Sequence, residues 1–207
     1  MKLINSLGRF AAEAARAITA HKFERTDDGR IYLPRARAFI GGVFRHAHAP
    51  AGQGFGPWAV DPNRLVGEGL DYILAAAFGN AAQINQFYLA PFSGNVSPAA
   101  NWTGANFATS ATEFQGYTLA SRLPWTVGAA SAQSIGNTAA VSDATLTFAA
   151  GGPYNLYGVG LVQAQGKGAT TGKLIAATRF ENPRLNMVAG DKLALEYVLS
   201  AKDESDA

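Results

Sequence analysis

The sequence contains no cysteine among its 207 residues, and it has few charged side chains. The absence of thiols excludes disulfide scaffolds, thiolate zinc sites, iron–sulfur clusters and cysteine nucleophiles. Only 15% of the residues are charged, against roughly 25% in an average soluble protein. The net charge of +2 is too small to indicate a nucleic-acid partner. The length predicts one domain with a sizeable core, or one domain with an appendage.

The sequence also lacks a long apolar run. Arg9, Glu13 and Arg16 interrupt the apolar residues between positions 3 and 20, whereas a signal peptide needs about 7–15 uninterrupted apolar residues and a membrane span about 20. We therefore expect no membrane partner. The apolar residues recur at intervals of three and four, which predicts a short amphipathic helix over residues 2–20.

The charges that are present are distributed unevenly. Residues 1–60 hold nine basic and four acidic residues, a net charge of +5, so the rest of the chain carries −3. Between Tyr72 and Gly166 the only charged residues are Glu113, Arg122 and Asp143. A polar but uncharged surface is typical of a chain packed against other copies, because a free monomer usually covers itself with charge. The scattered basic residues predict an arm that pairs with acidic neighbours rather than with nucleic acid.

Residue patterns divide the chain into residues 1–62, 63–200 and 201–207. The first part is a basic arm in which Asp28-Gly29 predicts a hairpin, and residues 37–45 predict a further strand. Residues 46–63 are rich in glycine and proline and predict a linker. The last part is an acidic tail, which we expect to be frayed.

The middle part begins with a predicted helix over residues 65–78. Its apolar stripe consists of Val66, Leu70, Ile73, Leu74 and Ala77, and Asp61 or Asn63 is the expected cap. The apolar period then changes to two, which predicts strands over residues 84–92, 113–119, 142–148, 154–162, 173–180 and 192–199. These features predict a mainly β fold: an antiparallel β-sandwich, jelly-roll or immunoglobulin-like, with one helix before it and an extended N-terminal arm.

Few residues suggest catalysis or metal binding. His46-x-His48 would point two imidazoles the same way in an extended segment, but the sequence offers no nearby third ligand, so we predict no metal site. Glu113, Asp143 and Glu181 are the candidates for a two-carboxylate hydrolase site, and each is more simply a surface or turn residue. We therefore predict no catalytic residue, no cofactor and no enzymatic activity.

Aromatic residues are plentiful after position 80, and two of them are candidates for a carbohydrate contact, namely Trp102 and Tyr154. Aromatic side chains pack in cores more often than they line exposed loops. Core packing is therefore the predicted role, and glycan binding stays as the alternative.

Six segments follow one another in a recognisable order after about Asn63: 66–74, 84–92, 113–125 with its Arg-x-Pro-Trp motif, 128–138, 172–180 and 190–199. Their succession resembles a group of small structural proteins encoded by tailed bacteriophages. The resemblance implies a virion component without enzymatic activity, a β-sandwich that decorates the capsid or belongs to the neck or tail. It implies no catalytic residues and does not extend to residues 1–60.

The sequence and the resemblance together predict a capsid decoration protein, or cement protein, that acts in the virion after assembly in the host cytoplasm. Its expected partners are the major capsid protein and other copies of itself, reached through residues 1–60. The predicted interface has three arginines that pair with acidic groups and two apolar anchors: Arg35, Arg37, Arg45, Phe55 and Trp58. The alternative is a neck, tail or head-fibre component that binds host-surface glycans, with neck or tail proteins as its partners.

Overall fold

The computed structural model describes residues 24–25, 31–32, 38–137 and 144–203, and the chain divides into two compact units. The first unit comprises Met1–Phe39 and Lys202–Ala207. Its described part contains β1 (Glu24–Arg25) and β2 (Ile31–Tyr32), which pair antiparallel. The two strands of the predicted hairpin therefore pair as expected. The Asp28-Gly29 turn and the predicted helix at residues 2–20 lie outside the described residues.

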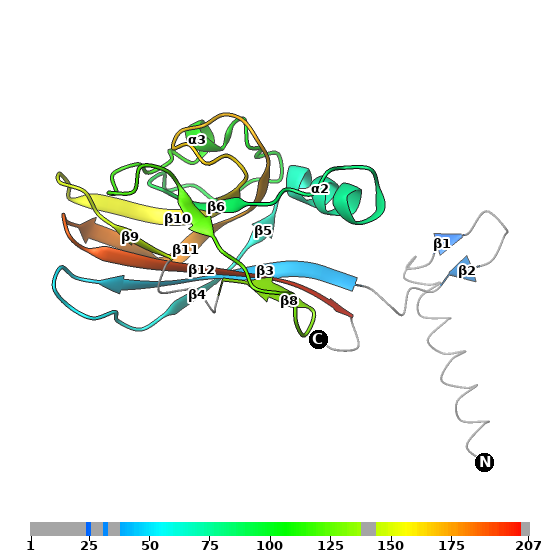
Figure 1. Ribbon diagram of the computed structural model, residues 1–207, viewed down its shortest axis with the longest axis horizontal. Helices are drawn as coiled ribbons and strands as arrows, with labels where there is room; N and C mark the ends of the chain where they lie inside the picture. Colours follow the sequence, from blue (N-terminus) through cyan, green and yellow to red (C-terminus); the bar gives the residue numbers. More distant parts are fainter. Residues whose placement is uncertain (1–23, 26–30, 33–37, 138–143, 204–207) are drawn as a thin grey trace, which may run out of the picture. The chain divides into compact units, whose positions relative to one another are not determined.

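The second unit, Ile40–Ala201, is built from two antiparallel sheets (Figure 1). The first sheet has the strand order β5 (Arg64–Leu65), β11 (Leu174–Met187), β10 (Tyr154–Val162), β6 (Phe87–Phe92) and β7 (Leu123–Trp125). The second has the order β4 (Ala59–Pro62), β3 (Ala38–Ala49), β12 (Lys192–Asp203) and β8 (Ser134–Gly136), and β9 (Thr145–Thr147) also pairs with β12.

Side chains of the two sheets share one hydrophobic core. Phe44 and Tyr197 of the second sheet lie in the same buried cluster as Leu89 and Leu161 of the first. Each of the four is almost fully buried, as expected where the inner faces of two sheets interdigitate. The predicted mainly β, antiparallel sandwich is confirmed.

Two helices lie between strands of the sandwich. The helix α2 (Gly67–Phe78) joins β5 to β6, and the single turn α3 (Phe107–Ser110) follows β6. Gly69 faces the backbone of Ile175, and a Cβ at this position would collide with that carbonyl group. Glycine therefore lets α2 lie close against β11.

The sequence prediction for α2 holds in its extent but not in its cap or its buried face. The N-cap is Val66, which makes no side-chain capping hydrogen bond, because Asp61 and Asn63 are used elsewhere. Asp61 Oδ1 accepts from the backbone N–H of Glu181, and Asn63 contacts β3 and β12. Of the predicted stripe, Val66 is buried and Ile73 packs against the core, whereas Leu70 and Leu74 are exposed.

The predicted linker over residues 46–63 is also partly wrong. Residues 46–49 continue β3, and residues 59–62 form β4, which pairs with β3 from Val43 opposite Pro62 to His46 opposite Ala59. The sandwich therefore begins before residue 63, and the helix follows three strands rather than preceding them. The predicted strand at 113–119 makes only isolated bridges, Phe92 with Glu113 and Tyr117 with Phe148.

One side chain fills a gap in the second sheet. β12 pairs with β9 up to Ala194 and with β8 from Val198 onward. Between these points Asn137 Nδ2 donates to the carbonyl of Leu195 at 3.1 Å, and Asn137 Oδ1 accepts from the backbone N–H of Tyr197 at 2.8 Å. The buried amide of Asn137 thus supplies the hydrogen bonds that a neighbouring strand would make.

Candidate functional site

The outward side of the β3–β4 pair carries exposed apolar residues around an arginine. Phe44 and His46 point inward and are fully buried, so Val43 and Arg45 lie on the opposite side of β3. Val60 stands directly opposite Arg45 in the register and is 55% exposed. We call Val43, Arg45, Trp58 and Val60 the β3–β4 outer face.

Arg45 is held in place by two neighbours. Its guanidinium lies over the ring of Trp58, 5.1 Å from the ring centroid, and NH1 donates to Glu196 Oε2 at 2.7 Å. Glu196 is nearly fully buried whereas Arg45 is partly exposed. The charge of Arg45 is therefore balanced inside its own chain, and the guanidinium presents a flat surface beside exposed apolar side chains.

The structure brings together two of the five predicted interface residues. Arg45 and Trp58 are in contact, although they are separated along the chain by the β3–β4 loop. Phe55 lies in this loop and is exposed. Arg35 and Arg37 lie outside the described residues. The sequence alone does not identify Val43 or Val60 as site residues. Val60 falls in the predicted linker, and the exposure of both depends on the register of β3 against β4.

His46 lies on the inner side of β3, in a buried chain of polar groups. Its Nδ1 accepts a hydrogen bond from Arg184 Nε at 2.9 Å, and its Nε2 lies 3.0 Å from Asp61 Oδ2, although these last two atoms are not aligned for a hydrogen bond. The ring stacks on Phe180, with centroids 3.9 Å apart. Burial and the neighbouring Arg184 lower the pKa of His46 to about 3, and burial raises the pKa of Asp61. His46 is therefore neutral, with its proton on Nε2.

His48 engages a different carboxylate, since its Nε2 lies 3.3 Å from Asp191 Oδ2. The two imidazoles of His46-x-His48 therefore do not converge on one ligand. Within residues 24–25, 31–32, 38–137 and 144–203, no group of three His, Cys, Asp or Glu side chains is arranged to hold a metal ion.

The candidate hydrolase carboxylates do not form a pair in the described part of the chain. Glu113 is buried against Arg122, with Arg122 Nε donating to Glu113 Oε1 at 2.8 Å and NH2 to Oε2 at 2.6 Å. The prediction that Glu113 is a surface or turn residue is therefore wrong. Glu181 is exposed on β11, and Asp143 lies outside the described residues.

The two candidate carbohydrate-binding aromatics are packing residues. Trp102 is buried with its ring edge-on to Phe92 and Phe107. Tyr154 packs on Phe114, and its hydroxyl donates to the carbonyl of Ala150 at 3.0 Å. Core packing, the predicted role, is confirmed for Trp102.

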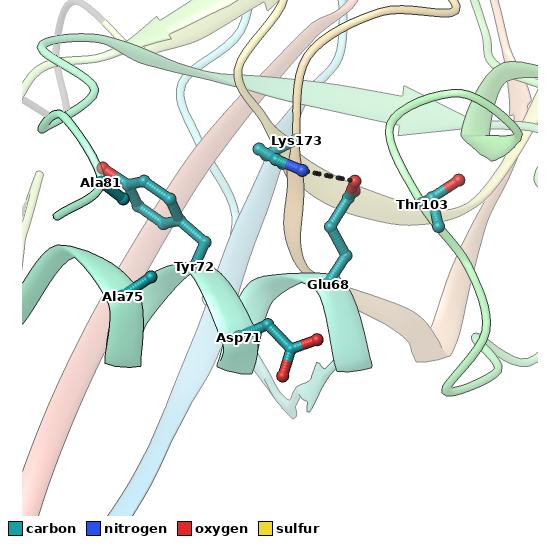
Figure 2. Close-up of a pocket in the computed structure, with 7 residues that line it drawn as sticks. All are labelled: Glu68, Asp71, Tyr72, Ala75, Ala81, Thr103 and Lys173. Atoms are coloured by element: carbon teal, nitrogen blue, oxygen red, sulfur yellow. Dashed lines mark hydrogen bonds and ion pairs between the residues drawn. The ribbon is translucent and has the colours of Figure 1, made fainter. Parts of the chain in front are cut away.

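A hollow of about 560 Å³ lies beside α2 and is lined by Glu68, Asp71, Tyr72, Ala75, Ala81, Thr103 and Lys173 (Figure 2). Glu68 is fixed in this wall: Oε2 accepts from the backbone N–H groups of Gly104 at 2.7 Å and Leu174 at 2.8 Å, and Oε1 lies 3.3 Å from Lys173 Nζ. The Glu68 carboxylate therefore ties the first turn of α2 to two loops rather than projecting free into the hollow.

No helix within the described ranges is long and apolar enough to cross a membrane. The β3–β4 outer face and the hollow beside α2 are two features of the described chain that offer a contact to another molecule. Comparison of the whole sequence and fold with protein-family models, curated proteins and solved structures finds no significant match to any of them.

Proposed function

We propose that this protein is a non-enzymatic structural component of a tailed-bacteriophage particle, where it decorates the capsid and stabilises the shell by bridging subunits. Its partners are the major capsid protein and other copies of itself, and its location is the virion, assembled in the host cytoplasm. The observation that carries the proposal is the β3–β4 outer face, in which Val43 and Val60 are exposed beside Trp58 and Arg45.

The composition of this face supports a protein contact. Interface centres are enriched in aromatic residues and arginine and depleted of unbalanced charge. Trp58 and Arg45 are of these types, and Glu196 already balances the charge of Arg45. A partner therefore gains apolar and stacking contact here without having to supply an acidic group. This arrangement replaces the ion pair with a neighbouring subunit that the sequence predicted for Arg45.

To decorate a capsid, the protein needs only enough contact area with the assembled shell. A protein that binds the assembled shell and not its separated subunits stabilises the shell by mass action. A specific contact between proteins needs roughly 800 Å² of buried surface from each partner. The low charge between Tyr72 and Gly166 favours close packing of copies, because few like charges have to approach one another. The alternative, a glycan-binding neck, tail or head-fibre component, loses support because Trp102 is buried against Phe92 and Phe107 and Tyr154 packs half-buried on Phe114.

The test uses phage particles that lack this protein, mixed with the purified full-length chain and sedimented. We expect hundreds of copies to bind per particle, since sites repeat over an icosahedral shell. The variant Trp58→Ala/Val60→Ser removes the centre of the outer face and should bind at least about tenfold more weakly. Circular dichroism of each variant checks that the sandwich is still folded.

The matched control is Val96→Ser, which removes an exposed valine between β6 and α3 and should bind like the natural chain. Undiminished binding of Trp58→Ala/Val60→Ser would refute the role of the outer face. Saturation at about six or twelve copies would place the protein at the neck or tail instead. No sedimentation with particles would overturn the proposed function.

A further inference from the structure

Three large apolar side chains of α2 face solvent in a single row. Leu70, Leu74 and Phe78 follow one another at intervals of four residues, which places them on one side of the helix. They are 39%, 53% and 88% exposed. The other side of α2, with Gly69 and Ile73, packs against the sandwich. The helix thus has two apolar sides, and within the described residues only one of them is covered.

The same helix lines the hollow with Asp71, Tyr72 and Ala75 (Figure 2). Glu68 and Asp71 are the only charged residues of α2, and both lie in its first half, while the second half is uncharged. The helix therefore combines a protruding phenyl ring at its end, a hollow along its first three turns, and acidic charge in its first half alone.

We infer that this side of α2 binds the α2 of a second copy of the chain, antiparallel and about a two-fold axis that passes through Leu74. Leu74 then meets its own counterpart, and Phe78 reaches Leu70 and the hollow beside Asp71 on the other copy. Such a contact is isologous, because one surface serves both partners.

The distribution of charge selects the antiparallel arrangement. A helix of 12 residues is about 18 Å long, so antiparallel helices keep the two acidic ends well apart. A parallel arrangement would set the two copies of Asp71 beside each other. Antiparallel helices also bring each N-terminus, with its partial positive charge, beside the partner's C-terminus.

The contact is weak in solution. Three side chains on one short helix cover much less than the roughly 800 Å² per partner of a stable interface. Association therefore needs high protein concentration or copies that are already held side by side, where effective concentration replaces affinity. The inference concerns the purified protein alone, so its failure would leave the particle-binding test untouched.

The absence of cysteine allows a direct test by disulfide cross-linking of the full-length chain. Leu74→Cys places the only thiol on the two-fold axis. Leu185→Cys places it on β11 at nearly the same exposure, 51%, and serves as the matched control. Under mild oxidation, followed on non-reducing gels, we expect Leu74→Cys to dimerise at least about tenfold faster than Leu185→Cys. Adding Phe78→Ser to Leu74→Cys should return the rate to that of the control.

Two further measurements test the geometry and the native contact. Asp71→Cys should cross-link slowly, because antiparallel helices hold the two copies of residue 71 apart. In sedimentation velocity the natural chain should show a sedimentation coefficient that rises with concentration, and Phe78→Ser should not. Equal rates for Leu74→Cys and Leu185→Cys, or no effect of Phe78→Ser, would overturn the self-association. Rapid cross-linking at both residue 74 and residue 71 would overturn the antiparallel order.

Discussion

The sandwich buries two ionic clusters that are built in different ways. In one, Arg122 and Glu113 meet directly through two hydrogen bonds, and both side chains are almost completely buried. In the other, the neutral imidazole of His46 lies between Arg184 and Asp61, and Arg184 is only half-buried.

The difference concerns how each cluster satisfies its polar groups. Arg122 also donates to the carbonyls of Ala164 and Ala169, and Glu113 Oε2 accepts from the backbone N–H of Gly168. This cluster therefore fixes the loop between β10 and β11 and contains no histidine. In the His46 cluster, the link between guanidinium and carboxylate depends on an imidazole that must remain neutral. The Arg122–Glu113 cluster should therefore contribute strongly to the free energy of unfolding. The His46 cluster should make that free energy depend on pH.

The largest expected effect comes from breaking the Arg122–Glu113 cluster. Arg122→Met leaves the Glu113 carboxylate buried without its counter-charge, which should lower the free energy of unfolding by about 3–5 kcal/mol. Urea denaturation followed by circular dichroism measures the change. The double variant Arg122→Met/Glu113→Leu should be less destabilised than the single variant, because it removes both charges. A single variant as stable as the natural chain would contradict the assignment.

Acid should destabilise the protein through His46. The pKa of His46 is about 3 in the folded protein, against about 6.5 in the unfolded chain. Between these values the unfolded state binds a proton that the folded state does not bind. The free energy of unfolding should therefore be unaffected above about pH 6.5 and should fall as the pH decreases. From pH 7 to pH 5 the loss is up to about 2 kcal/mol.

The control for this pH dependence is His46→Gln, whose amide can accept from Arg184 and donate to Asp61 but does not titrate. Urea midpoints at pH 7, 6 and 5 should decline much less for His46→Gln than for the natural chain. The raised pKa of Asp61 acts in the opposite direction at the acid end, because the folded state then binds that proton more readily. An unchanged pH dependence in His46→Gln would show that another group is responsible.

Removing Arg184 should cost less than removing Arg122. Arg184 is only half-buried, so water already solvates part of its charge, and it donates to the neutral imidazole of His46 and not to a carboxylate. We expect Arg184→Met to lower the free energy of unfolding by about 1 kcal/mol. The same change frees Nδ1 of His46 to take a proton near Asp61, which raises the pKa of His46 and weakens the acid sensitivity. A loss as large as that of Arg122→Met would remove the distinction between the two clusters.

The sequence predicted the sandwich because its strands show their period locally. The segment 192–199 alternates clearly and lies within β12, and the predicted segment 154–162 coincides with β10. The last four residues of β3, 46–49, are not predicted because His46 and His48 are polar. Their places in the strand depend on Asp61, Arg184 and Asp191, which lie far along the chain. Arg45 and Trp58 were identified as site residues without the stacking that joins them, since this contact requires β3 and β4 to pair.

The sequence did contain one signal for the pairing of Arg122 with Glu113. Glu113 and Arg122 are two of only three charged residues between Tyr72 and Gly166, and isolated opposite charges in a charge-poor region favour mutual pairing. Their backbone partners, at residues 164–169, are about 40 to 55 positions away. Local periodicity carries no information about contacts at that separation, so this part of the site needed the fold.

The smallest effect is expected at His48, the second imidazole of the pair. Its contact with Asp191 spans 3.3 Å, and its side chain is partly exposed. Asp191 keeps two other donors, the backbone N–H groups of Ala51 and Val188, which help to lower the pKa of its carboxyl. His48→Gln should therefore change the free energy of unfolding by less than about 0.5 kcal/mol in urea denaturation at pH 7. The acid sensitivity assigned to His46 should persist in this variant, because burial between a guanidinium and a carboxylate, and not the mere presence of an imidazole, couples the fold to pH.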